Sequence, residues 1–193
     1  NEIVLISILT SISDSLKNLH IKNIGNEQGS FLNGFNRLLE ILNAFSNSTF
    51  FQNNFIFTCG DEILDIALSP RCRDNAELLL NVSNLFLLFE FNLPIQVTHL
   101  ICFLLLLKSQ KATKTALILC SSFDKQQLED ILHMILLAFD EEVNQGFLSN
   151  EFITLMNKYP LLFNDKTTEL IPLLQNMLEK YSQSLSANNE NEE

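Results

Sequence analysis

The chain has 193 residues, of which 47% are hydrophobic, and a formal net charge of −11. This length and apolar content are enough for one folded domain with a substantial core. Nucleic-acid binding is driven by clustered Lys and Arg, and with 12 basic against 23 acidic residues no direct nucleic-acid partner is expected. Only 18% of residues are charged, which indicates that some apolar surface faces a partner or a neighbouring segment.

Apolar residues recur at helical spacing along almost the whole chain, which predicts an all-α fold. Residues 2–19 are expected to form a helix with one apolar stripe, and a polar loop with two glycines follows. The composition of residues 49–57 also suits a strand, but a lone strand has no pairing partner, so a short helix ending at Gly60 is predicted. The helices expected in this part of the chain span residues 2–19, 31–45, 49–57 and 61–68.

Residues 76–107 form the most apolar stretch, and Pro94 divides it into two expected helices, residues 74–90 and 94–108. A proline is favourable at a helix start, where its missing N–H would have no partner in any case. A helix that is apolar all round must be covered on several sides. Both helices are therefore predicted to lie at the centre of a stacked helical body.

Capping signals place the helices of the remaining chain. Asp124 with Gln127 three residues later forms a capping-box pattern, for a helix that ends at Gly146. Ser149 is expected to cap the next one. A single α-helical domain is predicted over residues 1–185, with an acidic, polar and disordered tail at residues 186–193. The helices expected here span residues 112–121, 124–145, 150–158 and 168–185.

Alternate helices begin near residues 31, 72, 112 and 150, an interval of about 40 residues that is typical of armadillo and HEAT repeats. The phrase Asn-Ala-Glu-Leu-Leu-Leu-Asn-Val-Ser-Asn-Leu-Phe, which starts at Asn75, resembles the third helix of an armadillo repeat. The resemblance implies stacked antiparallel helices in an armadillo/HEAT-like α-solenoid of about four helical units. It also implies a scaffold that binds a peptide or protein along one face.

The segment of residues 139–152 has the acidic residues and central glycine of a calcium-binding loop, but its spacing fails. With Gly146 at loop position 6, Val143 takes a ligand position and Glu151 falls one residue short of the position of the bidentate Glu. His99 and Cys102 lack the second ligand pair of a zinc site and are expected to face the core. No metal site is predicted.

No GxSxG, HExxH or P-loop motif occurs, so neither an enzyme nor a cofactor is predicted. A Cys–His nucleophile pair stays open, since such partners meet only in the fold. The four cysteines have no CxxC spacing and are expected to be reduced, in an intracellular protein of the cytoplasm or nucleus. The longest apolar run, residues 100–107, is too short for a membrane span, which needs about 20 residues.

Two clusters are candidates for partner binding. Phe50, Phe51, Phe55 and Phe57 are denser than one short helix buries by itself, which indicates either packing under the central helices or an exposed aromatic groove or dimer surface. A basic cluster follows the second central helix; it interacts favourably with the helix dipole or contacts an acidic peptide. The candidate residues are Phe50, Phe51, Phe55, Lys108, Lys111 and Lys114.

Three functional hypotheses follow. The first is a non-catalytic scaffold that binds a partner helix or peptide segment of another protein in a helical groove. The second is an α-helical homodimerisation or assembly domain of a larger complex, in which the surplus apolar surface is buried against itself. The third is a small-molecule pocket protein or enzyme with a cavity near His99 and Cys102.

Overall fold

The computed structural model describes residues 2–21, 28–45, 48–89 and 93–166, and residues 171, 172, 175 and 179. Every regular element in these ranges is a helix, so the all-α class is confirmed. The chain groups into two compact units, Asn1–Leu128 and Glu129–Glu193, which are described separately. Most of the helix expected over residues 168–185, and the tail at residues 186–193, lie outside the described residues.

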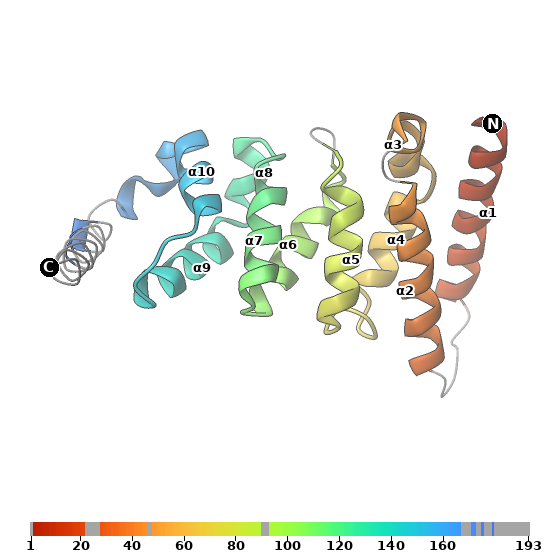
Figure 1. The fold of residues 1–193 in the computed structure, drawn as a ribbon, viewed down its shortest axis with the longest axis horizontal. Coiled ribbons are helices and arrows are strands. Elements are labelled where there is room, and N and C mark those ends of the chain that lie inside the picture. Colours follow the sequence, from red (N-terminus) through yellow and green to blue (C-terminus); the bar gives the residue numbers. More distant parts are fainter. Residues whose placement is uncertain are drawn as a thin grey trace, which may run out of the picture. The chain divides into compact units, whose positions relative to one another are not determined.

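The first unit is built from helices that run back and forth beside one another (Figure 1). Helices α2, α5 and α7 pack in that order in one row, and α4 and α6 form a second row against α5. None of the described helices is long and apolar enough to cross a membrane. The elements of this unit are α1 (Glu2–Ile21), α2 (Gln28–Ala44), α3 (Thr49–Phe55), η1 (Ile56–Gly60), α4 (Asp61–Ala67), α5 (Ala76–Phe86), α6 (Gln96–Leu106), α7 (Gln110–Cys120) and α8 (Lys125–Glu129), the last at the boundary.

The prediction that a helix ends at Gly60 is wrong, because α3, η1 and α4 form one continuous helix with a π turn at η1. Ser48 begins it by accepting a hydrogen bond from the Phe51 N–H at 3.3 Å. Gly60 has φ −61° and ψ −45°, an ordinary helical conformation rather than the left-handed one of a terminating glycine. The π turn inserts one residue into the helical register, and α1 packs along the whole element.

The predicted caps are confirmed. Asp124 and Gln127 exchange hydrogen bonds, with the Gln127 N–H donating to Asp124 Oδ1 at 2.8 Å and the Asp124 N–H donating to Gln127 Oε1 at 3.1 Å. Ser149 accepts from the Phe152 N–H at 3.4 Å. Gly146 has φ 78°, the conformation that ends a helix. The helix expected over residues 124–145 is nevertheless two helices, since α8 ends before α9 (Leu132–Asn144) begins.

The core of the first unit lies under α5. Phe55 is fully buried, with its ring centroid 5.1 Å from that of Phe51, 5.8 Å from that of Phe86 and 6.0 Å from that of Phe89. On α5 itself only Ala76, Glu77 and Asn84 are exposed. The central helices are thus covered on several sides, as their composition predicts.

The second unit contains α9, α10 (Asn150–Lys158) and the 3₁₀ helix η2 (Pro160–Lys166) around the rings of Phe139, Phe152 and Phe163. Glu142 is buried, and its Oε2 accepts the Ser149 N–H at 2.7 Å, so this carboxylate fixes the α9–α10 loop. Burial raises the pKa of Glu142, as does the charge of Glu151, while the hydrogen bonds to Ser149 act in the opposite direction.

Candidate protein-binding groove

Helix α1 has more apolar surface than its packing covers. Its closed side, with Leu9, Ser13 and Leu16 almost fully buried, packs against α3, η1 and α4. Its open side keeps Val4 50% exposed and Ile8 44% exposed. Single exposed aliphatic side chains are common on protein surfaces, whereas a contiguous row on one helix marks a binding surface.

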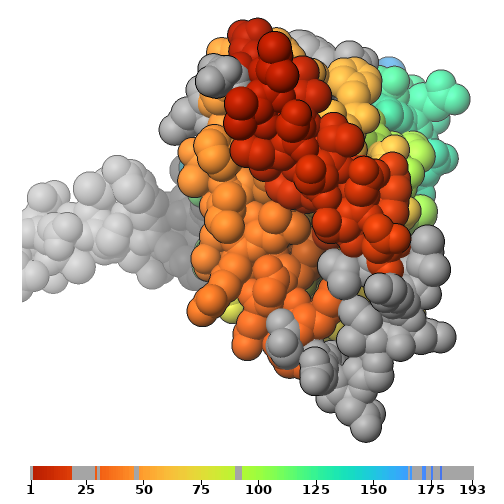
Figure 2. Space-filling view, turned by 90° about the vertical axis from the view of Figure 1, so that its right-hand side faces the viewer, coloured from red at the N-terminus to blue at the C-terminus, as the bar shows by residue number. Residues whose placement is uncertain are grey.

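The open side persists because α1 and its neighbour α2 pack on different helices. The main contacts of α2 are with α5, and the two are joined by a hydrogen bond from Asn43 Nδ2 to the Asn81 carbonyl at 3.2 Å. A second bond joins Asn81 Nδ2 to Asn36 Oδ1 at 3.5 Å. The two helices therefore lie side by side, but each has its main contacts with other helices. Figure 2 shows α1 in red on the surface beside α2 in orange.

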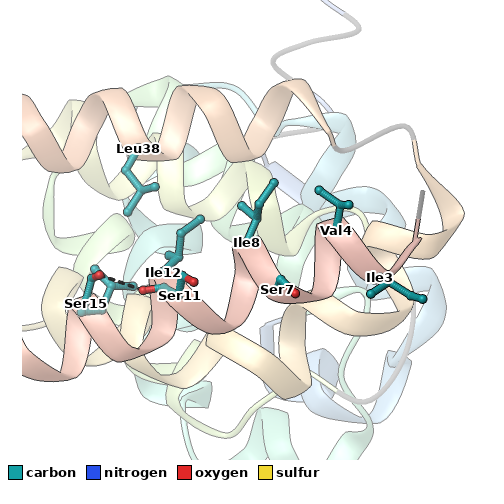
Figure 3. A pocket seen from close by; sticks show the side chains of 9 residues that line it. Ile3, Val4, Ser7, Ile8, Ser11, Ile12, Ser15 and Leu38 are labelled. Carbon is teal, nitrogen blue, oxygen red and sulfur yellow. Dashed lines mark hydrogen bonds between the residues drawn. The ribbon is translucent and has the colours of Figure 1, made fainter.

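The space beside α1 forms an open groove with a volume of about 600 Å³. Figure 3 shows Val4, Ile8 and Ile12 directed toward the side where Leu38 of α2 lies. Three serines, each four residues from the next, form a second row along α1. The groove is lined by Ile3, Val4, Ser7, Ile8, Ser11, Ile12, Ser15, Leu16 and Leu38.

The chemistry of this lining suits apolar contact. None of the nine lining residues is titratable, so the groove supplies no general acid, general base or carboxylate ligand for a metal. The Ser15 hydroxyl donates to the Ser11 carbonyl at 2.7 Å, and a helix that covers Ser15 leaves that donor paired. Apolar side chains can therefore cover Ser15 at little cost in lost hydrogen bonds.

An ion pair holds the closed side of α1. Lys17 Nζ lies 3.0 Å from Glu62 Oε1 of α4. Burial by itself would raise the pKa of Glu62, but hydrogen bonds from Lys17, from its own backbone and from Ser13, with the charge of Lys17, lower it overall. The hydrogen bond to Glu62, and then its charge, raise the pKa of Lys17.

The structure does not bring the three candidate phenylalanines to this groove. Phe51 and Phe55 are fully buried and Phe50 is half-buried, which supports core packing for the first two rather than contact with a partner. Phe57, two residues further on in the π turn, is 87% exposed. No strand-like or helical pattern distinguishes Phe57 from Phe55 in the sequence, because the inserted residue shifts the register between them.

The three candidate lysines are exposed and lie away from the groove lining. Lys108 has φ 51° and follows the end of α6, where its N–H donates to the Leu105 carbonyl at 3.2 Å. Lys111 and Lys114 lie in the first turns of α7. The structure thus places all three at one helix–helix turn, and Lys108 in the position that commonly ends a helix.

The residues weighed for zinc or nucleophilic chemistry are also placed. His99 is exposed, so the prediction that it faces the core is wrong; Cys102, one turn later, is half-buried. Burial raises the pKa of all four thiols, to about 12 for Cys59, and therefore favours the unreactive protonated form. Within the described ranges, no three His, Cys, Asp or Glu side chains meet in a way that would hold a metal ion.

The helix expected over residues 2–19 has a single apolar stripe, so the groove is not among the sequence predictions. The signal is present, because Val4, Ile8 and Ile12 follow one another at four-residue spacing, in a row that does not contain the fully buried Leu9. The sequence does not show which side of α1 the neighbouring helices cover. No protein-family model, curated protein or solved structure matches this chain.

Proposed function

We propose that the first unit is a non-catalytic protein-binding module that takes an amphipathic helix in the groove between α1 and α2. The observation that carries the proposal is the open, uncharged lining of about 600 Å³, in which Val4 and Ile8 keep half of their surface free. Burying such side chains against a partner is favourable at roughly 25 cal/mol per Å².

A helix suits this groove better than an extended segment. On the open side of α1, side chains form rows in which each residue is four positions from the next. Ridges of another helix fit between such rows. An extended peptide gains most of its affinity from main-chain hydrogen bonds, and helices α1 and α2 offer no free strand edge for them. The bound helix would contribute apolar residues at positions i, i+3 or i+4, and i+7.

The arrangement of helices supports the wider scaffold interpretation. The row α2, α5 and α7 and the second row α4 and α6 are consistent with an armadillo/HEAT-like stack of helical units that holds an intracellular protein partner. In such stacks each unit contacts mainly its neighbours, as α5 contacts α2, α4, α6 and α7 here.

The test is site-specific photo-crosslinking in cells, with a photoreactive residue in place of Ser11 in the groove or of Ile118 on α7. Ile118 is 40% exposed and is therefore a matched control for a groove position. A defined adduct from position 11 that Ile8→Glu abolishes, with circular dichroism unchanged, is the expected result. Equal adducts from both positions, or none from position 11, would reject the groove as the binding site.

A further inference from the structure

We infer that the helix in the groove is α1 of a second copy of this chain, packed antiparallel across a two-fold axis. This inference rests on the proposed function, because it uses the same groove. The observation behind it is that two adjacent rows on α1 differ in side-chain size: large aliphatic side chains occupy one row and serines occupy the row next to it.

The two rows have the geometry of a ridge and a furrow. Val4, Ile8 and Ile12 are four residues apart, which places them on one i±4 ridge of the helix surface. Three small serines lie three residues further on, at the same spacing, and leave a furrow beside that ridge. Packing the i±4 ridges of two helices into each other's furrows is the commonest mode of helix packing in globular proteins.

One antiparallel register pairs all three ridge residues with the three serines. It places Val4 opposite Ser15 of the second copy, Ile8 opposite Ser11 of the second copy, and Ile12 opposite Ser7 of the second copy. The same register places Leu16, the next residue of the aliphatic row, opposite Ile3 of the second copy, which precedes the serines in their row. A two-fold axis repeats each contact, so the same face of both copies forms the interface, as in most homodimers.

The polarity of the face permits this contact. No charged residue lines the groove, so the net charge of the chain places no like-charged side chains opposite each other there. Ser15 already donates its hydroxyl within its own helix, and the small serines allow the ridge of the other copy to approach closely.

The available area agrees with a reversible dimer. The 20 residues of α1 are about 30 Å long, and α1 with α2 presents a strip about 20 Å wide. Two such strips bury roughly 1,200 Å², the lower end of the range for specific interfaces. Interfaces of this size include transient complexes, so the dimer is expected to dissociate on dilution.

The experiment exchanges ridge and furrow in the purified full chain and follows mass by sedimentation velocity over a wide concentration range. Ile8→Ser removes part of the ridge and should weaken self-association at least about tenfold, since the loss occurs twice. Ser11→Ile places a large side chain against Ile8 of the other copy and should give a monomer. The double variant Ile8→Ser/Ser11→Ile exchanges the two and should restore the dimer to within about threefold.

Ile118→Ser on α7 is the matched control and should leave the mass unchanged. Hydrogen exchange of the unmodified chain supplies a measurement that needs no variant: amides of α1 should become more protected as concentration rises, and those of α7 should not. A double variant as monomeric as its parents would overturn the register, and a wild-type chain that stays monomeric throughout would overturn the second copy as occupant. In the latter case a groove adduct with another protein leaves the proposed function standing, whereas the absence of any groove adduct rejects both.

Discussion

Helices α1 and α5 are both rich in apolar residues, yet the structure uses them in opposite ways. Helix α5 contacts α2, α4, α6 and α7, and Leu78, Leu79, Val82 and Leu85 are fully buried. Helix α1 has its main contacts with α3, η1 and α4 and leaves Ile3, Val4 and Ile8 exposed. The difference between a core helix and a partly uncovered helix here is the number of neighbours rather than composition.

This comparison separates two roles of apolar surface in the same unit. The area that α5 buries contributes to folding, because it is removed from water in the isolated chain. The area that α1 leaves open contributes nothing to folding and becomes available for association. Variants on covered and open positions should therefore change different measured quantities.

The largest expected effect is on the covered side, at Phe55. Phe55→Ala removes a fully buried ring that contacts Phe51, Phe86 and Phe89, and should lower the free energy of unfolding by about 3–5 kcal/mol. Phe57→Ala removes the same side chain from a position that is 87% exposed and should change it by less than about 0.5 kcal/mol. Urea unfolding followed by circular dichroism measures both, and similar losses would contradict the burial assigned to the π turn.

Two adjacent residues sharpen the comparison within α1. Leu9→Ala should cost about 2–5 kcal/mol of unfolding free energy, because Leu9 is fully buried against the long helix of α3, η1 and α4. Ile8→Ala should cost less than about 1 kcal/mol when measured on dilute protein, where association adds no stability. If Ile8→Ala destabilised the dilute chain as much as Leu9→Ala, the side of α1 described as open would in fact be covered.

Much of this fold follows from local sequence signals. The caps at Asp124 and Ser149 and the end of α9 at Gly146 depend on hydrogen bonds or backbone angles within a few residues, and these predictions are confirmed. The break between α8 and α9 and the continuation of the helix through Gly60 were not predicted. The continuation through Gly60 involves packing partners distant in the sequence, because α1 packs against η1 and the Phe86 ring lies beside Gly60; these outweigh the local preference of a glycine.

The candidate site was less accessible to sequence reasoning than the fold. The density of aromatic residues made Phe51 and Phe55 candidates for partner binding, but the structure places both in the core. The Val4, Ile8 and Ile12 row is visible in the sequence, but an apolar row reads the same whether a neighbour covers it or not. The row stays open because α2 packs mainly on α5, and this packing is visible only in the structure.

A smaller effect comes from the second unit, where a covered group carries a charge. Glu142→Ala leaves the Ser149 N–H without its acceptor and should cost about 1–3 kcal/mol, whereas Glu142→Gln keeps an oxygen for that N–H. Tyrosine fluorescence reports on this unit, because Tyr159 and Tyr181 are the two tyrosines of the chain. Equal losses in the two variants would show that the hydrogen bond does not fix the loop.

The same carboxylate predicts a pH dependence of defined sign. Because the folded-state pKa of Glu142 is raised above 4.5, the folded chain holds a proton that the unfolded chain has lost in the interval just above that pH. This group therefore lowers stability as pH rises through the interval. As pH rises from 4 to 7, the free energy of unfolding of Glu142→Gln should increase relative to that of the wild type. A relative decrease over that range would contradict the raised pKa.

The smallest effect is expected at the ion pair on the closed side of α1. Because the pKa of Glu62 is lowered, its charge stabilises the folded chain above about pH 4.5, and this stabilisation is lost as pH falls through the folded-state pKa. Because the pKa of Lys17 is raised, its charge stabilises the folded chain below about pH 10.5, and this stabilisation is lost as pH rises through the folded-state pKa. Lys17→Gln should therefore increase hydrogen exchange of α1 between these limits and have no effect beyond them. Added salt should shrink the difference, since the Lys17 side chain is 56% exposed. Arg37→Gln removes the same charge from α2 and should leave α1 unchanged; an equal response to both variants would mean that net charge, rather than the contact with Glu62, holds α1 against α4.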